Sequence, residues 1–341
     1  MKNDFGKKDD KNKGMNMATG TGKFLTFMDE VIDLRQKENR PGTAGNYRNT
    51  SRSFAAYLAH RGCKDVSLHK VSGELLAGYQ DWMLSAGRSR NTTACHMRNL
   101  RATYNQAIRC GLLSVPLSGH PFANMLTRPS STRKRAASPE LIRQLRSLDI
   151  RAGLIAMGKD PGKKTFRKTL DDLTFARDTF IFCFFACGLP FVDFAYLTHG
   201  NLRGGFLCYE RHKTGRYIEM EILPEMHSFI NRYATDGGHY LFPVIRSLST
   251  TDAYHQYVKA LRKYNHKLRM LSSLLGAGIS LTTYIPRHSW ATTVYHHNMP
   301  VAYICERMGH TSEKTTRTYL KSFESSKIDE ANKRILQSIF R

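Results

Sequence analysis

The spacing of apolar residues predicts a bundle of helices in the first third of the chain. Apolar side chains recur there every three or four residues, the period of one face of an α-helix. The pattern runs through Phe24–Leu34, resumes after Pro41-Gly42, and restarts at Ser72, which we expect to cap a third helix. A fourth helix is expected from about Asn91 to Arg109. Residues 23–113 are therefore predicted to form one helical domain.

A change in composition predicts a linker and a second domain. Residues 114–137 are rich in proline, serine and glycine and end in the basic run Arg133-Lys134-Arg135, which is typical of a linker. Ser138-Pro139-Glu140 then supplies an N-cap, a first-turn proline and an acid that the helix dipole favours, so a second domain is predicted over 138–341. Residues 1–22 have almost no apolar content, and we interpret them as a disordered, solvated tail rather than a phosphate-binding arm.

The hydrophobic period changes within the second domain. A long apolar helix is expected through Phe175–Cys187. Apolar and polar residues then alternate in Tyr217–Ile222, which with Phe206–Tyr209 flanks Lys213-Thr-Gly-Arg216 as a short β-hairpin. Further helices are expected at about 253–275 and 286–297. The pattern predicts a mainly α protein with a small β-sheet.

The charge of the chain indicates a polyanionic partner. Its 52 lysines and arginines outnumber its 28 acids, for a formal net charge of +24. Such a charge repels itself in an isolated protein, and nucleic acid is the partner that explains it best. An anionic membrane surface is the alternative, but no apolar run reaches the ~18 residues of a spanning helix and no signal sequence is evident. We therefore expect a soluble, intracellular protein.

The cysteines and histidines argue against a disulfide framework and a metal site. The seven cysteines are scattered and include no Cys-x-x-Cys pair, so they are expected to be reduced thiols. The histidines include no spacing typical of metal ligands. The sequence predicts neither a metal ion nor another cofactor.

Arginines follow one side of the predicted fourth helix. Acids are absent from Arg88 to Arg109, so pairing along the helix cannot explain the arginines between them. A solvated face is the alternative, but contact with a DNA backbone is the favoured interpretation. The candidate DNA-binding residues are Arg88, Arg90, Arg98, Arg101 and Arg109, with Arg133, Lys134 and Arg135 of the linker.

Groups suited to phosphodiester chemistry gather near the C-terminus. Arg287, His288, His310 and Tyr319 lie within a short stretch of the chain. A catalyst that cuts DNA without a metal needs cationic donors for the phosphate oxygens and a proton donor for the leaving oxygen. Arginine suits the first task because its guanidinium is planar and permanently charged. A tyrosine hydroxyl can attack phosphorus and form a covalent intermediate.

The order and spacing of these residues resemble the signature of the tyrosine recombinases, the phage integrase family. The resemblance lies in Tyr284-x-x-Arg287-His288, Met308-Gly-His310-Thr and Thr315-Thr-x-x-Tyr319. Lys213 occupies the hairpin where that family carries its catalytic lysine, and residues 23–111 resemble its core-binding domain. The likeness implies a helical core-binding domain plus a tyrosine-recombinase catalytic domain, joined by a linker and closing as a clamp around DNA.

The resemblance also implies a role for each residue. Tyr319 would be the nucleophile that forms a 3′-phosphotyrosyl bond, and Lys213 would protonate the leaving 5′-oxygen. Arg287 and His310 would hold the scissile phosphate, while His288 would assist by hydrogen bonding or proton relay. The bond energy kept in the covalent intermediate would let strands be exchanged without ATP.

Two positions depart from the family pattern. The first catalytic arginine of the family is replaced at Gly188-Leu-Pro190, although Asp193 stands where the family has an acid. Tyr284 stands where the family has a histidine or lysine, and its hydroxyl can still donate one hydrogen bond. Four arginines are candidates to replace the missing one, and the sequence does not choose among them: Arg177, Arg203, Arg211 and Arg216.

The likeness implies partners and leaves alternatives open. The expected partners are double-stranded DNA with inverted-repeat half-sites and, on that DNA, three further copies of the chain in a homo-tetramer. The tail is too short for an arm-binding domain, which favours simple sites such as those of an invertase or a mobile-element recombinase. Inversion, integration and excision stay open as outcomes. One rival is a DNA-binding protein that lost catalysis, motivated by Pro190; a metal-dependent nuclease is the other, and it lacks a carboxylate cluster.

The last apolar stripe has two interpretations. Ile328, Ala331, Ile335 and Ile339 fall on one face of an expected helix just after Tyr319. That helix could fold onto its own core, or it could dock on a neighbouring protomer, as the family's habit of exchanging this segment implies. Docking on the neighbour is the favoured expectation.

Overall fold

The chain divides into two compact units, residues 1–132 and 133–341. The computed structural model describes residues 22–114, 119–130, 136–317, 320 and 335–338. The division falls within the stretch 114–137 that the composition marks as a linker, and the finer domain boundaries stay predictions. Nearly all of the predicted tail, the basic run at 133–135 and most of the predicted C-terminal helix lie outside the described residues.

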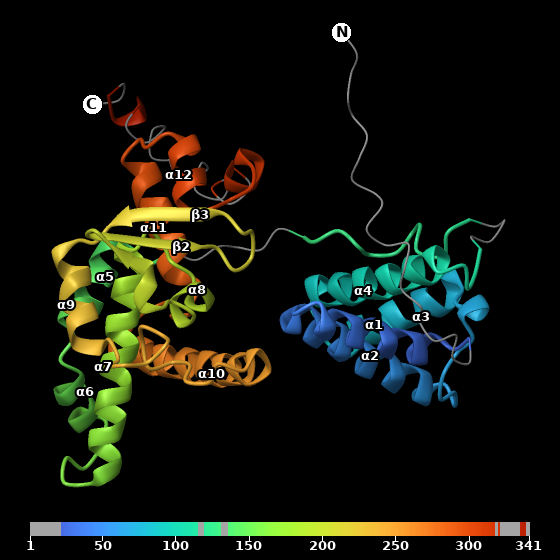
Figure 1. Ribbon diagram of the computed structural model, residues 1–341, viewed down its shortest axis with the longest axis horizontal. Coiled ribbons are helices and arrows are strands. Elements are labelled where there is room, and N and C mark those ends of the chain that lie inside the picture. Colours follow the sequence, from blue (N-terminus) through green and yellow to red (C-terminus); the bar gives the residue numbers. More distant parts are fainter. Residues whose placement is uncertain (1–21, 115–118, 131–135, 318–319, 321–334, 339–341) are drawn as a thin grey trace. The chain divides into compact units, whose positions relative to one another are not determined.

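The first unit is built from helices, and serine side chains cap the starts of two of them. Its elements are α1 (Phe24–Lys37), α2 (Pro41–His60), the short 3₁₀ turn η1 (Leu68–Lys70), α3 (Gly73–Ser85) and α4 (Arg90–Arg109) (Figure 1). The expected cap of the third helix is confirmed, because Ser72 Oγ accepts a hydrogen bond from the N–H of Leu75 at 3.2 Å. Ser89 caps α4 in the same way through Thr92, so that helix begins one residue earlier than expected.

Aromatic rings fill the centre of the first unit. Phe54 of α2 lies 5.8 Å from Phe24 of α1 and 5.1 Å from Tyr79 of α3, both edge to face. The hydroxyl of Tyr79 is 2.8 Å from Ser53 Oγ and 2.9 Å from the Nδ1 of His96 on α4, so the buried phenol is satisfied. This packing turns the apolar face of α4 inward and leaves its arginines at the surface.

The second unit is mainly helical around a long central helix. Its described helices are α5 (Pro139–Ser147), α6 (Ile150–Ala156), α7 (Lys164–Phe185), α8 (Phe191–Ala195), the 3₁₀ turn η2 (His199–Asn201), α9 (Pro224–Tyr233), α10 (Thr250–Leu274), α11 (Ile285–His296) and α12 (Val301–Arg307). α5, α6, α9, α10 and α11 all pack against α7. The cap predicted at Ser138 is confirmed by its hydrogen bond from Leu141 N–H. The helix expected at Phe175–Cys187 is present, but it begins earlier, at Lys164.

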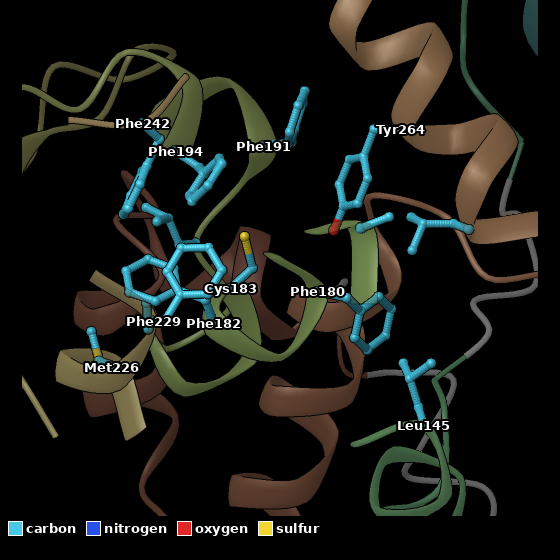
Figure 2. Packing of buried hydrophobic residues seen from close by; sticks show 14 of the residues in the cluster. Leu145, Phe180, Phe182, Cys183, Phe191, Phe194, Met226, Phe229, Phe242 and Tyr264 are labelled. Carbon is cyan, nitrogen blue, oxygen red and sulfur yellow. The ribbon is translucent and has the colours of Figure 1, made fainter. Parts of the chain in front are cut away.

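Stacked phenylalanines hold the core of the second unit together (Figure 2). Phe182 of α7 lies 4.6 Å from Phe229 of α9, and Phe194 of α8 stacks on Phe242 at 4.6 Å. Burying each such ring contributes about 1.5–3 kcal/mol relative to leaving it exposed. This core anchors α8 and the end of α7, the two elements that lead into the candidate site.

The sheet of the second unit is a short antiparallel meander. It consists of β1 (Leu202–Arg203), β2 (Phe206–Glu210) and β3 (Tyr217–Glu221) in that order. In the β2–β3 ladder, Leu207 pairs with Met220 and Tyr209 with Ile218, and these four side chains are buried. The predicted hairpin is therefore confirmed, while β1 was not predicted. Across the described residues, no helix has the length and apolar character of a membrane-spanning segment.

Candidate active site

Arg287 is buried where α7, α11 and the turn after α12 meet. It lies in the first turn of α11 and its exposed fraction is 4%. Its Nη1 donates to the carbonyl of Gly188 at 3.1 Å, and its Nη2 donates to the carbonyl of Met308. Gly188 has φ +73°, and a Cβ there would lie 2.7 Å from the Cα of Arg287. Glycine is therefore required at the end of α7, because a side chain would displace the arginine.

His310 contacts this arginine from the turn that follows α12. Its Nε2 lies 3.2 Å from Nη2 of Arg287, and its Nδ1 lies 2.9 Å from the hydroxyl oxygen of the buried Thr316. The turn needs Gly309, whose φ is +61° and whose Cβ would lie 2.7 Å from Cγ of Arg211. Two residues from separate sequence motifs, Arg287 and His310, are thus brought into direct contact.

Arg211 supplies a second buried guanidinium at the same point. Its exposed fraction is 6%, and its Nη1 donates at 2.6 Å to the Met308 carbonyl that also accepts from Arg287. Its Nε lies 2.8 Å from Oδ2 of the buried Asp193. Burial raises the pKa of Asp193, and Arg211, the N–H of His212 and Arg287 oppose that shift. Two guanidinium groups and one carboxylate are therefore buried together, and these three groups carry a net positive charge.

The other three candidate arginines do not show the contacts that bring Arg211 to Arg287. Arg177 pairs with Asp178 at 2.8 Å and donates to the carbonyl of Leu148. Arg203 donates to the carbonyl of Gly200 at 2.8 Å, and Arg216 is exposed in the turn before β3. Of the four, Arg211 is the one that shares a hydrogen-bond acceptor with Arg287.

Lys213 lies in the turn between β2 and β3, and its side chain is exposed. The next residue, Thr214, donates from its hydroxyl to the carbonyl of Gly309 at 3.1 Å. That bond holds the turn of Lys213 beside the turn that carries His310.

His288 and Tyr284 form the outer side of the site. His288 follows Arg287 in α11 and is half-buried, and its ring centroid lies 5.1 Å from that of Tyr284. Tyr284 is 55% exposed, so it lies at the surface of the site. Both lie in the same helical turn as the buried arginine.

The proposed nucleophile, Tyr319, lies outside the described residues. The residue after it, Leu320, is buried in a cluster with Ala291, Ile304 and Met308. Met308 is the residue whose carbonyl accepts from both guanidinium groups. The chain next to Tyr319 is therefore anchored at the candidate site.

The predicted basic face of α4 is exposed. Arg88, Arg90, Arg98, Arg101 and Arg109 are all at the surface. Arg98 also donates to the carbonyl of Thr127 at 2.9 Å, which steadies it against the following loop. Arg133, Lys134 and Arg135 lie outside the described residues.

A second basic stripe, on α10, was missed in the sequence. Its residues recur at steps of four and three, the period that places side chains on one helical face. All are exposed: His255, Lys259, Arg262, His266 and Arg269. Asp252 is the acid within α10, so acids of the same helix cannot neutralise the stripe. The spacing of these residues in the sequence was the signal that could have predicted the stripe.

Among the described residues, no group of three or more metal-binding side chains comes together.

Two family models match the sequence. The phage integrase SAM-like domain matches residues 23–118, and the phage integrase family matches residues 177–326. Together these matches cover well over half of the chain. No match was found among the curated proteins.

Solved structures resemble the whole fold at low sequence identity. A lambda integrase dimer bound to a COC′ core site is 14% identical, with a TM-score of 0.58, covering 87% of this chain and 77% of that one. A lambda integrase tetramer bound to a Holliday junction is 14% identical, with a TM-score of 0.58 and coverage of 88% and 78%. The Tn1549 transposon integrase in complex with a circular intermediate DNA is 15% identical, with a TM-score of 0.52 and coverage of 91% and 99%.

Proposed function

The chain belongs to the tyrosine recombinase (phage integrase) family, and from this premise we propose that it cuts and rejoins DNA through a 3′-phosphotyrosyl intermediate. The reaction uses side chains alone and needs no metal ion. The observation that carries the proposal is the meeting of Arg211, Arg287 and His310 around Met308. Buried, fixed cationic donors are what a catalyst needs to stabilise the extra negative charge on a phosphorane-like transition state.

In this proposal Arg211 takes the place of the arginine that is missing at Pro190. It is buried, paired with Asp193 and bonded to the same carbonyl as Arg287. A guanidinium has five N–H donors, so each arginine keeps donors for a phosphate oxygen after its contacts with the protein. The two forks and His310 would hold the non-bridging oxygens of the scissile phosphate.

The covalent step distributes its protons among three side chains. The oxygen of Tyr319 attacks phosphorus as His288 accepts the phenolic proton. The bond from phosphorus to the 5′-oxygen breaks, and the leaving oxygen takes a proton from Lys213. Rejoining reverses these transfers when another 5′-hydroxyl attacks the phosphotyrosine. Tyr284 contributes a hydrogen bond at the rim of the site.

The substrate is double-stranded DNA with inverted-repeat half-sites, and the working assembly is a homo-tetramer in the cytoplasm, on the nucleoid. The exposed arginines of α4 and the basic stripe of α10 support contact with the DNA backbone. The lambda integrase tetramer on a Holliday junction supports a tetramer here by analogy. Inversion, integration and excision all follow from the same cutting and rejoining. The arrangement of the recombination sites on the DNA determines which of them results.

A nicked half-site that releases its short 5′-hydroxyl strand after cleavage tests the proposal. The wild-type chain should become covalently attached to this DNA in the presence of a chelator, whereas Tyr319→Phe should bind it and form no adduct. A normal adduct from Tyr319→Phe would overturn the choice of nucleophile. Tight binding without any wild-type adduct would favour the alternative, a DNA-binding protein that lost catalysis at Pro190. Sensitivity to the chelator would point to a metal-dependent nuclease.

Truncation tests the tetramer separately. We expect a chain ending at Phe323 to bind one half-site as a monomer and to fail to bring paired sites together. The reason is the apolar stripe that follows, in which the side chain of Ile335 is 55% exposed; the neighbouring Leu336 is 45% exposed. Native gel shifts with one and two half-sites measure this. Normal assembly and recombination by the truncated chain would show that the C-terminal stripe does not couple protomers.

A further inference from the structure

The turn that carries Lys213 is fastened on both sides of the lysine. Arg211 is held by Asp193 and by the Met308 carbonyl, and Thr214 is held by the Gly309 carbonyl. The main chain closes the turn, because the N–H groups of Gly215 and Arg211 donate to the carbonyls of Arg211 and Arg216, both at 2.8 Å. The lysine side chain itself extends from this fixed turn into solvent.

His212, between Arg211 and Lys213, is held by two contacts from the α8 segment. Its backbone N–H donates to Oδ1 of Asp193 at 2.8 Å. Its imidazole lies against the ring of Tyr196, with centroids 4.6 Å apart and planes tilted by 32°. Asp193 and Tyr196 are three residues apart, which places them on one side of a helical turn. The carboxylate therefore holds the backbone of His212 while the phenol ring holds its side chain.

Tyr196 is a rigid support because aromatic rings from two other segments contact it. Tyr240 lies edge to face with it at 6.0 Å, and Tyr257 of α10 lies at 6.0 Å with a tilt of 50°. The next carbonyl, that of Leu197, accepts a hydrogen bond from Leu241 N–H at 2.7 Å. The ring beneath His212 is thus fixed by the core of the second unit rather than by the hairpin.

From these contacts we propose that Tyr196 and His212 are positioning residues, which act by stacking to hold Lys213 at the leaving 5′-oxygen. The inference rests on the proposed role of Lys213 as proton donor. Lysine has a flexible side chain, so its aim depends on the backbone from which it extends. A turn fixed in advance lowers the entropy lost when the ammonium group meets its target. His212 contributes its ring face and not a proton.

A sulfur-substituted substrate separates this role from general damage to the site. Two nicked half-sites are compared, one with the ordinary 5′-bridging oxygen and one with sulfur in that place. A thiolate leaves without being protonated far more readily than an alkoxide, since thiol pKa values lie near 8.5. The sulfur substrate therefore needs the arginines and the tyrosine nucleophile but not the proton donor. Lys213→Ala is the reference variant. It should cleave the oxygen substrate slowly and cleave the sulfur substrate at close to the wild-type rate.

The expected result is selective rescue. Tyr196→Ala and His212→Ala should each cut the oxygen substrate roughly tenfold to a hundredfold more slowly, part of the range a positioned general acid contributes. Both should cut the sulfur substrate within about twofold of the wild-type rate, because that substrate does not need the general acid. Tyr196→Phe and His212→Phe keep a stacked ring and should behave as the wild type on both substrates.

Three outcomes would overturn the inference. If Tyr196→Ala slows both substrates equally, the ring supports the whole site and not the lysine. If His212→Phe is as slow as His212→Ala, the imidazole acts through its nitrogens and not by stacking. If both alanine variants cut normally, the stack is not needed. His212 is exposed, so its variants fold even if Tyr196→Ala does not. If the sulfur substrate does not restore cleavage by Lys213→Ala, the proposed role of Lys213 itself is refuted.

Discussion

The arginines at the candidate active site and the arginines of α4 carry the same group in opposite surroundings. Arg211 and Arg287 are 6% and 4% exposed, and each is fixed by backbone carbonyls. Arg98, Arg101 and Arg109 are exposed on α4. The buried pair converges on one point, whereas the exposed set is spread along a helical face.

Under the proposed function, this difference predicts that the rate of cutting and the affinity for DNA depend on different arginines. A buried guanidinium costs desolvation, which its fixed acceptors and Asp193 offset, and it then acts on one phosphate without reorganising. An exposed guanidinium costs little desolvation. Salt screens its attraction to phosphate, and its contribution to binding adds to those of the neighbouring arginines. Substitution in the first set should therefore lower the rate of cutting, and substitution in the second should weaken salt-dependent binding.

The largest effect is expected from Arg211→Lys. Lysine keeps the positive charge, so Asp193 stays paired, but it loses the planar fork that reaches Met308 and, in the proposed mechanism, a phosphate oxygen. We expect adduct formation to slow by about 100-fold or more, the cost of removing one fixed donor from such a site. The matched control is Arg216→Lys, an exposed arginine on the same hairpin, which should react normally. If the two variants form the adduct at equal rates, Arg211 does not act in the reaction.

The α4 arginines should change binding and leave the reaction intact. Wild-type binding is expected to fall steeply with salt, and the triple variant Arg98→Gln, Arg101→Gln, Arg109→Gln should flatten the plot of log K against log salt. The slope should decrease by about 0.9 for each phosphate contact that is lost. Once the DNA is saturated, cleavage should proceed at the wild-type rate.

The control for that variant is Arg40→Gln, because Arg40 is exposed and lies 3.7 Å from Glu38. Its removal should leave the slope unchanged. A flat salt dependence in the wild-type chain would mean that the basic surface serves something other than DNA.

The smallest effect is expected on stability, from the buried hydroxyl of Tyr264. Unlike the buried arginines, it has no hydrogen-bond partner among the described residues. Tyr264 lies in the core beside Phe191 (Figure 2). Burial raises the pKa of this phenol well above its ordinary value. Tyr264→Phe removes the unsatisfied group at almost constant shape, so thermal unfolding should show equal or greater stability, by about 1 kcal/mol at most. A clear loss of stability would reveal a partner for the hydroxyl.

Much of the fold could be predicted because its signals are local. Ser72 and Ser138 cap helices through residues three positions away, and alternation marks the β2–β3 hairpin. Signals too short or too polar were missed: β1 has two residues, and the first half of α7 is rich in charged side chains. Pattern reasoning therefore located the elements better than their ends.

The candidate site was only partly accessible to the same reasoning. Arg287 and His310 could be chosen because they lie in recognisable motifs. Arg211 could not be separated from three other arginines, since its burial depends on Met308, far away in sequence, and on Asp193. Contacts between distant segments decide such a choice, and the local pattern around Arg211 does not contain them.

One short hairpin carries both the second buried guanidinium and the proposed proton donor, because Arg211 and Lys213 are two residues apart. A displacement of this turn would withdraw the charge clamp and the acid in a single movement. In the proposed mechanism, a protomer with a displaced turn would be unable to cut, although the α4 arginines could still hold it on its half-site. If Arg211 and Lys213 have their proposed roles, the position of this one turn would therefore control both the charge clamp and the proton transfer.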